Sequence, residues 1–225
     1  VDLIEGIYKD DVVSKPHFAV SCQHYSFAVN AFVDVIREFD ACQYDFTIRE
    51  EQTHEIIEDV TNLKSELGVI YLSSKNTEVL SKMLKRNELE FTELFTATPH
   101  VFICDSHPLA SKKNITMDDL QDYPYLTYEQ GEYNSQYFSE EFVSTLDSRK
   151  NIRVRDRATL FNLIIGLNGY TVCSGVISAE LNGRNIISKP LDVEEYMRIG
   201  IISRKGVVLS RYAREYIEAL KAHCM

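Results

Sequence analysis

The stretch FAVSCQHYSFAVNAFVDVIREF, residues 18–39, joins a short apolar strand to an amphipathic helix. From Ala28 onward, apolar residues recur at 28, 31, 32, 35, 36 and 39, which is one face of a helix. A polar cluster stands where the strand meets the helix: Ser21, Gln23, His24, Tyr25 and Ser26, with Cys22 among them. A single serine is enough to cap a helix. Capping is the plain explanation, but the whole cluster favours contact with a ligand.

The rest of the chain continues this alternation of strands and helices. Apolar runs predict strands at 17–21, 46–50, 67–72, 100–106, 125–128, 151–155, 170–174 and 198–203. Helical periodicity predicts helices at 54–64, 135–146, 158–167 and 209–223, the first of them capped by Thr53. A short helix is expected after a capping box of Thr116 and Asp119. This order predicts an α/β fold with parallel strands, in which ligands bind beyond the carboxyl ends of the strands.

Composition and motifs exclude several classes of function. The net charge of −10 argues against direct binding to DNA or to an acidic membrane, and no apolar run could span a bilayer. Five cysteines are widely spaced and favour a reducing cytosol over a disulfide framework. The six histidines form no HExxH pair and no GxSxG elbow is present, so we expect no metal, no cofactor and no catalytic residues.

Four segments together resemble the effector-binding domain of LysR-type transcriptional regulators. They are the strand, turn and helix at 18–39 with FTIREEQTHEIIEDV after it, then SELGVIYL, CDSHPLASKKNITMDDLQDYPYLTYEQG and LFNLIIGLNGYTVCSGVIS. The resemblance spans about residues 16–222, and the third segment is most similar to the subgroup that controls cysteine and sulfur metabolism. Leu63 departs from the family, which often has glycine there, and CQHY does not reproduce that subgroup's threonine-rich turn.

The resemblance implies a two-lobed fold like that of periplasmic binding proteins, with two strands crossing between the lobes. Residues 1–14 would be the remnant of a linker, 15–97 with 199–225 would form lobe I, and 98–198 would form lobe II. A winged helix that binds DNA would precede Val1. The amino termini of two helices would point at the same cleft and favour an anionic group there. We therefore expect a small anionic or zwitterionic metabolite between the lobes, in a cytoplasmic protein.

Further ligand contacts are expected at turns that face the cleft in the family. In lobe I these are Gln52, Thr53 and His54, where capping by Thr53 is the alternative. In lobe II they are Tyr128, Gln130 and Asn134, with Ser174 and Gly175 at the end of a later strand. The alternative for Tyr128, Gln130 and Asn134 is an ordinary loop that contains glycine. The alternative for Gly175 is a turn that requires glycine for its backbone conformation.

Val29 and Val33 widen the apolar arc of the first helix beyond what one core requires. We expect them to lie at a homodimer interface, in a dimer or a tetramer, as the resemblance also implies. Two other functions remain open on this fold: an extracellular solute-binding protein of an ABC transporter, and an enzyme. The residues before Val1 would separate the transporter protein from the regulator.

Overall fold

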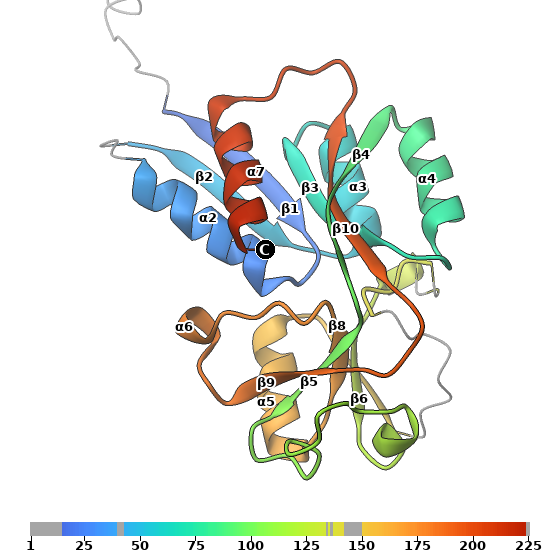
Figure 1. The fold of residues 1–225 in the computed structure, drawn as a ribbon. Coiled ribbons are helices and arrows are strands. Elements are labelled where there is room, and N and C mark those ends of the chain that lie inside the picture. Colours follow the sequence, from blue (N-terminus) through green and yellow to red (C-terminus); the bar gives the residue numbers. More distant parts are fainter. Residues whose placement is uncertain (1–14, 40–42, 134, 136, 142–149, 224–225) are drawn as a thin grey trace, which may run out of the picture.

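A computed structural model describes residues 15–39, 43–133, 135, 137–141 and 150–223, and these residues form two α/β lobes (Figure 1). The helices are α2 Ser26–Glu38, α3 Thr53–Thr61, α4 Thr77–Arg86, α5 Arg157–Leu167, α6 Ala179–Asn182 and α7 Arg211–His223. The strands are β1 His17–Cys22, β2 Asp45–Glu50, β3 Leu67–Leu72, β4 Leu89–Ala97, β5 His100–Cys104, β6 Tyr125–Tyr128, β7 Asn151–Val154, β8 Thr171–Cys173, β9 Ile186–Pro190 and β10 Met197–Arg204. None of the described helices is long and apolar enough to cross a membrane.

Lobe I is a five-stranded sheet in the order β2-β1-β3-β10-β4, covered by helices on both faces. Strands β1, β2 and β3 are parallel, whereas β10 runs antiparallel to β3 and β4. Val69 and Tyr71 of β3 join the core beneath α2 and α7, while Ile70 and Leu72 join the core beneath α3 and α4. Strand β3 is therefore buried along its whole length, as its continuous apolar run predicts.

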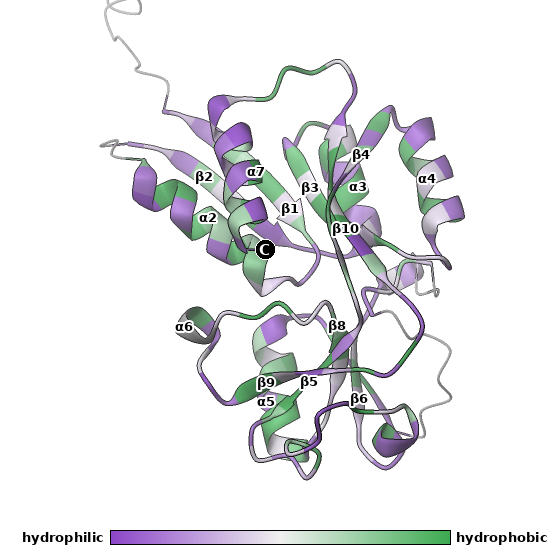
Figure 2. Cartoon of the chain, viewed as in Figure 1, coloured by the Kyte–Doolittle hydropathy of each residue, from purple (hydrophilic) through white to green (hydrophobic). Residues whose placement is uncertain are grey.

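Lobe II has a three-stranded sheet, β8-β5-β9, and a parallel pair, β6 and β7, with α5 packed against both. Figure 2 shows that α4 and α7 alternate between hydrophilic and hydrophobic residues along their length, as helices with one face to the core do.

Two strands, β4 and β10, lead from one lobe to the other, so the chain crosses twice (Figure 1). The crossings fall between Ala97 and His100 and between Pro190 and Met197. The predicted two-lobed fold with two crossing strands is confirmed, although the second predicted boundary, residue 199, lies inside β10. Apolar residues of both lobes share one buried cluster, which includes Phe27 from lobe I and Tyr125 from lobe II. The lobes are therefore packed together.

Three local predictions were wrong or incomplete. The described part of the predicted helix at 135–146, residues 135 and 137–141, is not helical. Gln52, not Thr53, is the N-cap of α3, in a capping box with Glu55. Helices α4 and α6 and strands β4 and β9 were not predicted, although the apolar stripe of TEVLSKMLKR could have revealed α4.

A Schellman motif ends α3, with a leucine in the position that normally holds glycine. The Lys64 N–H donates to the Asp59 carbonyl, and the Leu63 N–H donates to the Val60 carbonyl. Leu63 has φ 57°, and the residue is 60% exposed. Because a side chain at this φ is strained and little of the leucine is buried, the departure from the family's glycine should cost stability.

We predict that Leu63→Gly stabilises the protein by about 0.5–1 kcal/mol. Relief of the left-handed strain, about 1–2 kcal/mol, exceeds the entropy that glycine adds to the unfolded chain, about 0.4–1 kcal/mol. Urea denaturation at neutral pH measures the change. Leu63→Ala is the matched control, because it keeps the Cβ atom and should show no such gain. A Leu63→Gly variant no more stable than the wild type would contradict the assignment.

Candidate functional site

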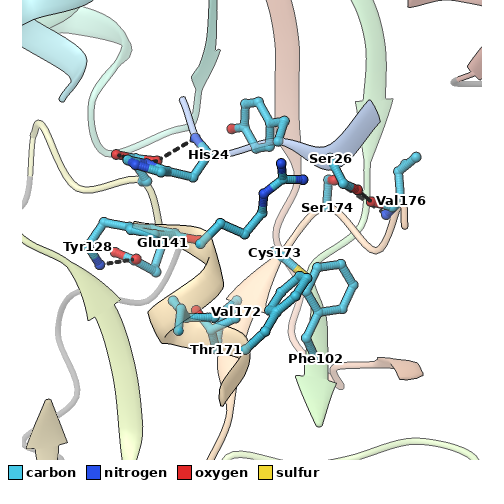
Figure 3. Close-up of a pocket in the computed structure, with 15 residues that line it drawn as sticks. His24, Ser26, Phe102, Tyr128, Glu141, Thr171, Val172, Cys173, Ser174 and Val176 are labelled. Atoms are coloured by element: carbon cyan, nitrogen blue, oxygen red, sulfur yellow. Dashed lines mark hydrogen bonds and ion pairs between the residues drawn. The ribbon is translucent and has the colours of Figure 1, made fainter. Parts of the chain in front are cut away.

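A small cavity lies between the lobes, at the amino-terminal ends of α2 and α5. Its walls come from the β1–α2 turn, β5, β6, the segment 140–141, α5, and β8 with the residues after it (Figure 3). The residues that line it are His24, Tyr25, Ser26, Phe102, Tyr128, Glu140, Glu141, Arg157, Leu160, Phe161, Thr171, Val172, Cys173, Ser174 and Val176. Its free volume is about 30 Å³. That space holds one or two water molecules and not a metabolite.

An ion pair between His24 and Glu140 crosses the cleft. The Glu140 carboxylate accepts the His24 backbone N–H at 2.9 Å and lies 2.8 Å from the ring Nδ1. The ring Nε2 lies 3.1 Å from the Arg155 carbonyl oxygen. Because both ring nitrogens face groups that can only accept, the geometry requires the imidazolium form. Both side chains are only 4% exposed.

The pKa of His24 agrees with this geometry. Burial alone would lower the pKa, but the charge and hydrogen bonds of Glu140 outweigh burial and raise it above the ordinary value. The imidazole ring also stacks on the Tyr128 ring, with centroids 3.9 Å apart. His24 of lobe I is therefore held by Glu140 and Tyr128 of lobe II.

A second set of polar contacts surrounds the start of α3. Gln52 supplies the cap, so the Thr53 hydroxyl is available to accept from Gln23 at 2.7 Å and to donate to the Phe138 carbonyl at 2.8 Å. The Thr53 N–H donates to Gln130 Oε1 at 3.0 Å, and Gln130 Nε2 donates to Glu140 at 3.0 Å. The two networks thus meet at Gln130.

Glu141 lies beside Glu140 and is kept as a neutral acid near pH 7. Burial and the neighbouring Glu140 charge raise the pKa of Glu141 to about 8, against the lowering effect of the Tyr128 N–H and Ser139. The Tyr128 N–H donates to Glu141 Oε1 at 2.7 Å (Figure 3). Two adjacent buried carboxyl groups are a costly arrangement, of the kind that gathers at functional sites.

Two further groups on the lobe II side could contact a ligand. Arg157, the first residue of α5, lines the cavity and forms an ion pair of 3.1 Å with Glu50 of lobe I. The Thr171 hydroxyl is buried in the cavity wall with no hydrogen-bond partner among the described residues. A buried hydroxyl without a partner costs free energy unless a ligand or water binds it.

The structure brings some of the predicted ligand contacts together at this cleft. His24, Tyr25, Ser26, Tyr128 and Ser174 line the cavity. The predicted residues Gln23, Gln52, Thr53 and Gln130 lie in or beside the adjoining network. The Ser26 hydroxyl donates to the Val176 carbonyl at 3.3 Å (Figure 3) and does not cap its own helix.

Other predicted residues lie elsewhere. The buried Ser21 hydroxyl contacts Asp59 and Ser65, because alternate residues of β1 face opposite sides of the sheet. The Cys22 side chain is buried in the lobe I core. His54 packs its ring on Tyr133.

Gly175 has φ 83°, and a Cβ atom there would come within 2.6 Å of the His100 ring, so the turn itself requires glycine. Asn134 lies outside the described residues.

Of the cysteines that the structure describes, Cys22 and Cys104 are buried, whereas Cys173 is partly buried and lines the cavity. Burial raises the pKa of Cys22 and of Cys173 well above the ordinary value, which makes these thiols unreactive. Among the residues described, no group of three or more histidines, cysteines or acidic residues could hold a metal ion.

Among the cavity-lining residues with charged or hydroxyl side chains, Glu140, Glu141, Arg157 and Thr171 were not predicted from the sequence. The two glutamates lie in a stretch with helical periodicity, which made them look like exposed residues. Arg157 could have been found, since it follows a strand and the capping residue Asp156 at the start of a helix.

Two α/β lobes, two crossing strands and polar groups of both lobes at one cleft define a ligand-binding domain of the periplasmic-binding-protein type. Residues 20–225 match the family described as the LysR substrate binding domain, and the chain belongs to this family of transcriptional-regulator domains.

Comparisons with individual proteins agree. The chain is 24% identical over 185 residues to the malolactic fermentation system transcriptional activator of Lactococcus lactis subsp. lactis (strain IL1403), covering 73% of this chain and 62% of that relative. The chain therefore spans less than two thirds of that relative's length.

Solved structures of regulators share the fold. The reduced OxyR regulatory domain from Pseudomonas aeruginosa has a TM-score of 0.64 at 14% identity, covering 93% of this chain and 97% of that one. HinK, a LysR family regulator from Pseudomonas aeruginosa, has a TM-score of 0.59 at 16% identity, covering 98% and 74%. The effector-binding domain of QuiR in complex with shikimate has a TM-score of 0.61 at 18% identity, covering 93% and 97%.

We predict that the free energy of unfolding falls as the pH rises from 5 to 8. His24 and Glu141 both have raised pKa values, so the folded state binds more protons than the unfolded state and loses stability as the pH rises. For Glu141 the window runs from its ordinary value of 4.5 to about 8, with a slope of at most about 1.4 kcal/mol per pH unit.

Urea denaturation across this pH range measures the slope. Glu141→Gln should make the slope shallower, because the amide does not titrate. Glu78→Gln is the control, since Glu78 is exposed and its pKa is lowered by Lys82, below the range tested. An unchanged slope in Glu141→Gln would show that this carboxyl group is not protonated in the folded state.

Proposed function

We propose that the chain is the effector-sensing domain of a LysR-type transcriptional regulator, which binds a small anionic or zwitterionic metabolite between its lobes. The observation that carries the proposal is the convergence at one cleft of His24, Gln130, Arg157 and the Thr171 hydroxyl, which has no hydrogen-bond partner among the described residues. A ligand that prefers one arrangement of the lobes shifts the population toward it. This shift would control DNA binding and transcription through a winged helix preceding Val1.

The chemistry of the cleft supports a carboxylate ligand. The His24 N–H, its imidazolium and the Gln130 amide all point their hydrogens at one carboxylate, that of Glu140. The Arg157 guanidinium, which suits bidentate binding of a carboxylate, lies at the same cavity. Two of the similar proteins suggest probes. Shikimate, with which QuiR was solved, is a carboxylic acid, and L-malate is a natural test for a relative of a malolactic fermentation regulator.

The family match favours this regulator over the solute-binding protein of a transporter. We further propose that the regulator acts in the cytoplasm, contacts DNA only through its winged helix and assembles as a homodimer or tetramer. The membership in a regulator family also favours a domain without catalytic activity.

We predict that a carboxylate probe perturbs the cleft. Titration of ¹⁵N-labelled protein with L-malate and with shikimate should shift the amide signals of His24, Gln130 and Thr171 for at least one of the two. Arg157→Gln should weaken that binding by about 10- to 150-fold, the loss of one charge-assisted hydrogen bond. Arg198→Gln is the control, because Arg198 pairs with Glu93 on the partly exposed β10–β4 edge of lobe I. Shifts confined to residues outside the cleft would contradict the proposal.

The outer side of α2 supports the proposed dimer. Ala28, Ala31 and Phe32 are buried beneath α7, where the Tyr216 hydroxyl donates to the Ala28 carbonyl at 2.9 Å. Val29 and Val33 are only partly buried in the single chain. These two valines lie one helical turn apart, so they leave apolar surface available to a second copy of the chain. The two copies would be related by a twofold axis.

We predict that Val29→Glu combined with Val33→Glu separates the protomers, since two carboxylates would be buried at the interface. Multi-angle light scattering measures the mass, and circular dichroism checks the fold. Val207→Glu with Val208→Glu is the control, because these exposed valines lie in the loop before α7. A folded α2 variant that keeps the oligomeric mass of the wild type would refute the interface.

A further inference from the structure

We propose that the segment Phe138–Glu141 is an internal occupant of the effector cleft, and that the carboxylate of an effector binds by displacing Glu140. This inference rests on the proposed function for its meaning. Its experiment, however, needs no knowledge of the natural effector.

The first step is that Glu140 has the contacts of a bound ligand. Its carboxylate receives the His24 N–H, faces the His24 imidazolium and accepts from the Gln130 amide. These three groups come from both lobes and from two turns that face the cleft. A carboxylate on a separate molecule would find the same partners at the same place.

The second step is that the segment spans the lobes. It follows β6 of lobe II in the chain, yet Phe138 packs in the lobe I core with Ile56, Ile57 and Leu80. The Thr53 hydroxyl donates to the Phe138 carbonyl, and the Tyr71 hydroxyl donates to the Glu141 carbonyl at 3.3 Å. Removal of Glu140 from its position would therefore loosen contacts that join lobe II to lobe I.

The cavity is too small for a metabolite. The cavity beside Glu140 measures about 30 Å³, whereas pockets for small metabolites measure about 300–1,000 Å³. A metabolite can enter only if the lobes open or the occupant leaves. Because Glu140 already holds the donors that a carboxylate needs, displacement of Glu140 both makes room and frees those donors.

The burial of two neighbouring carboxyl groups costs free energy. Glu140 and Glu141 are buried side by side, and the raised pKa of Glu141 shows that the protein resists a second negative charge there. A buried ion pair is weak evidence for stability alone, because hydrophobic residues of similar size are often as stable. The arrangement is explained if Glu140 occupies a binding site that the carboxylate of an effector can take over.

The test is complementation of Glu140→Ala by a small carboxylate. This variant leaves a space lined by the His24 N–H, the His24 ring and the Gln130 amide. Acetate should fill the space, so isothermal titration calorimetry should show acetate binding at least about tenfold tighter than to the wild type, within the affinity that four heavy atoms allow. Methylammonium, a small organic cation, should bind to neither protein.

Glu129→Ala is the matched control, because it removes a carboxylate from the exposed pair with Arg155 and should gain no acetate binding. If Glu140→Ala is unfolded in chloride buffer, acetate and not methylammonium should restore its circular dichroism spectrum. Acetate that neither binds nor refolds the variant would overturn the inference. So would methylammonium that binds the wild type and not Glu140→Ala, which would make Glu140 a receptor for cations.

These outcomes are separate from those of the proposed function. Failure of L-malate and shikimate to bind the wild type would count against the proposed effector class and leave acetate complementation as an independent result. A carboxylate that does bind the wild type should bind Glu140→Ala more tightly, because no occupant must first leave. Weaker binding to the variant would overturn the displacement of Glu140.

Discussion

The contact on which the arrangement of the two lobes depends is the ion pair between His24 and Glu140. It joins the turn before α2 in lobe I to a segment that follows β6 in lobe II, and both partners are withdrawn from water. The Arg155 carbonyl on one side and the Tyr128 ring on the other hold the imidazole in place. Because the charge of each partner is stabilised by the other, movement of one lobe relative to the other would leave a buried charge without its partner.

This constraint connects the fold to the proposed function. Strands β1 and β3 are parallel, so the residues after their carboxyl ends gather at the edge of lobe I that faces lobe II. Gln23 illustrates the result: its side chain contacts Thr53 at the start of α3, the Tyr25 hydroxyl and the Tyr71 N–H. A ligand that binds here acts on groups that already join the lobes, and so it can change the balance between lobe arrangements.

Sequence patterns predicted the fold where one local rule was sufficient. The run LGVIYL is covered on both faces and matches β3 residue for residue, and the Thr116–Asp119 capping box forms as expected. Strand β4 was not predicted, because most of its residues are exposed or half-buried and polar side chains interrupt its apolar pattern. Residues 135 and 137–141 belong to a stretch with helical spacing but are not helical, because burial of Phe138 in the core of lobe I overrides that local preference.

The location of the candidate site could be predicted from the sequence more fully than the residues that form it. A polar cluster at the end of β1 indicated the cleft, and His24, Tyr25 and Ser26 do line it. The sequence could not reveal that Glu140 lies against His24, since 116 residues separate them and only the fold joins them.

The protonation state of His24 tests this account most directly. Long-range ¹H–¹⁵N spectra of the wild type at pH 7.5 should show both ring nitrogens of His24 protonated, and Glu140→Gln should show a neutral ring at the same pH. A neutral His24 in the folded wild type at pH 7.5 would contradict the ion pair. It would also contradict the proposal that Glu140 occupies the effector cleft.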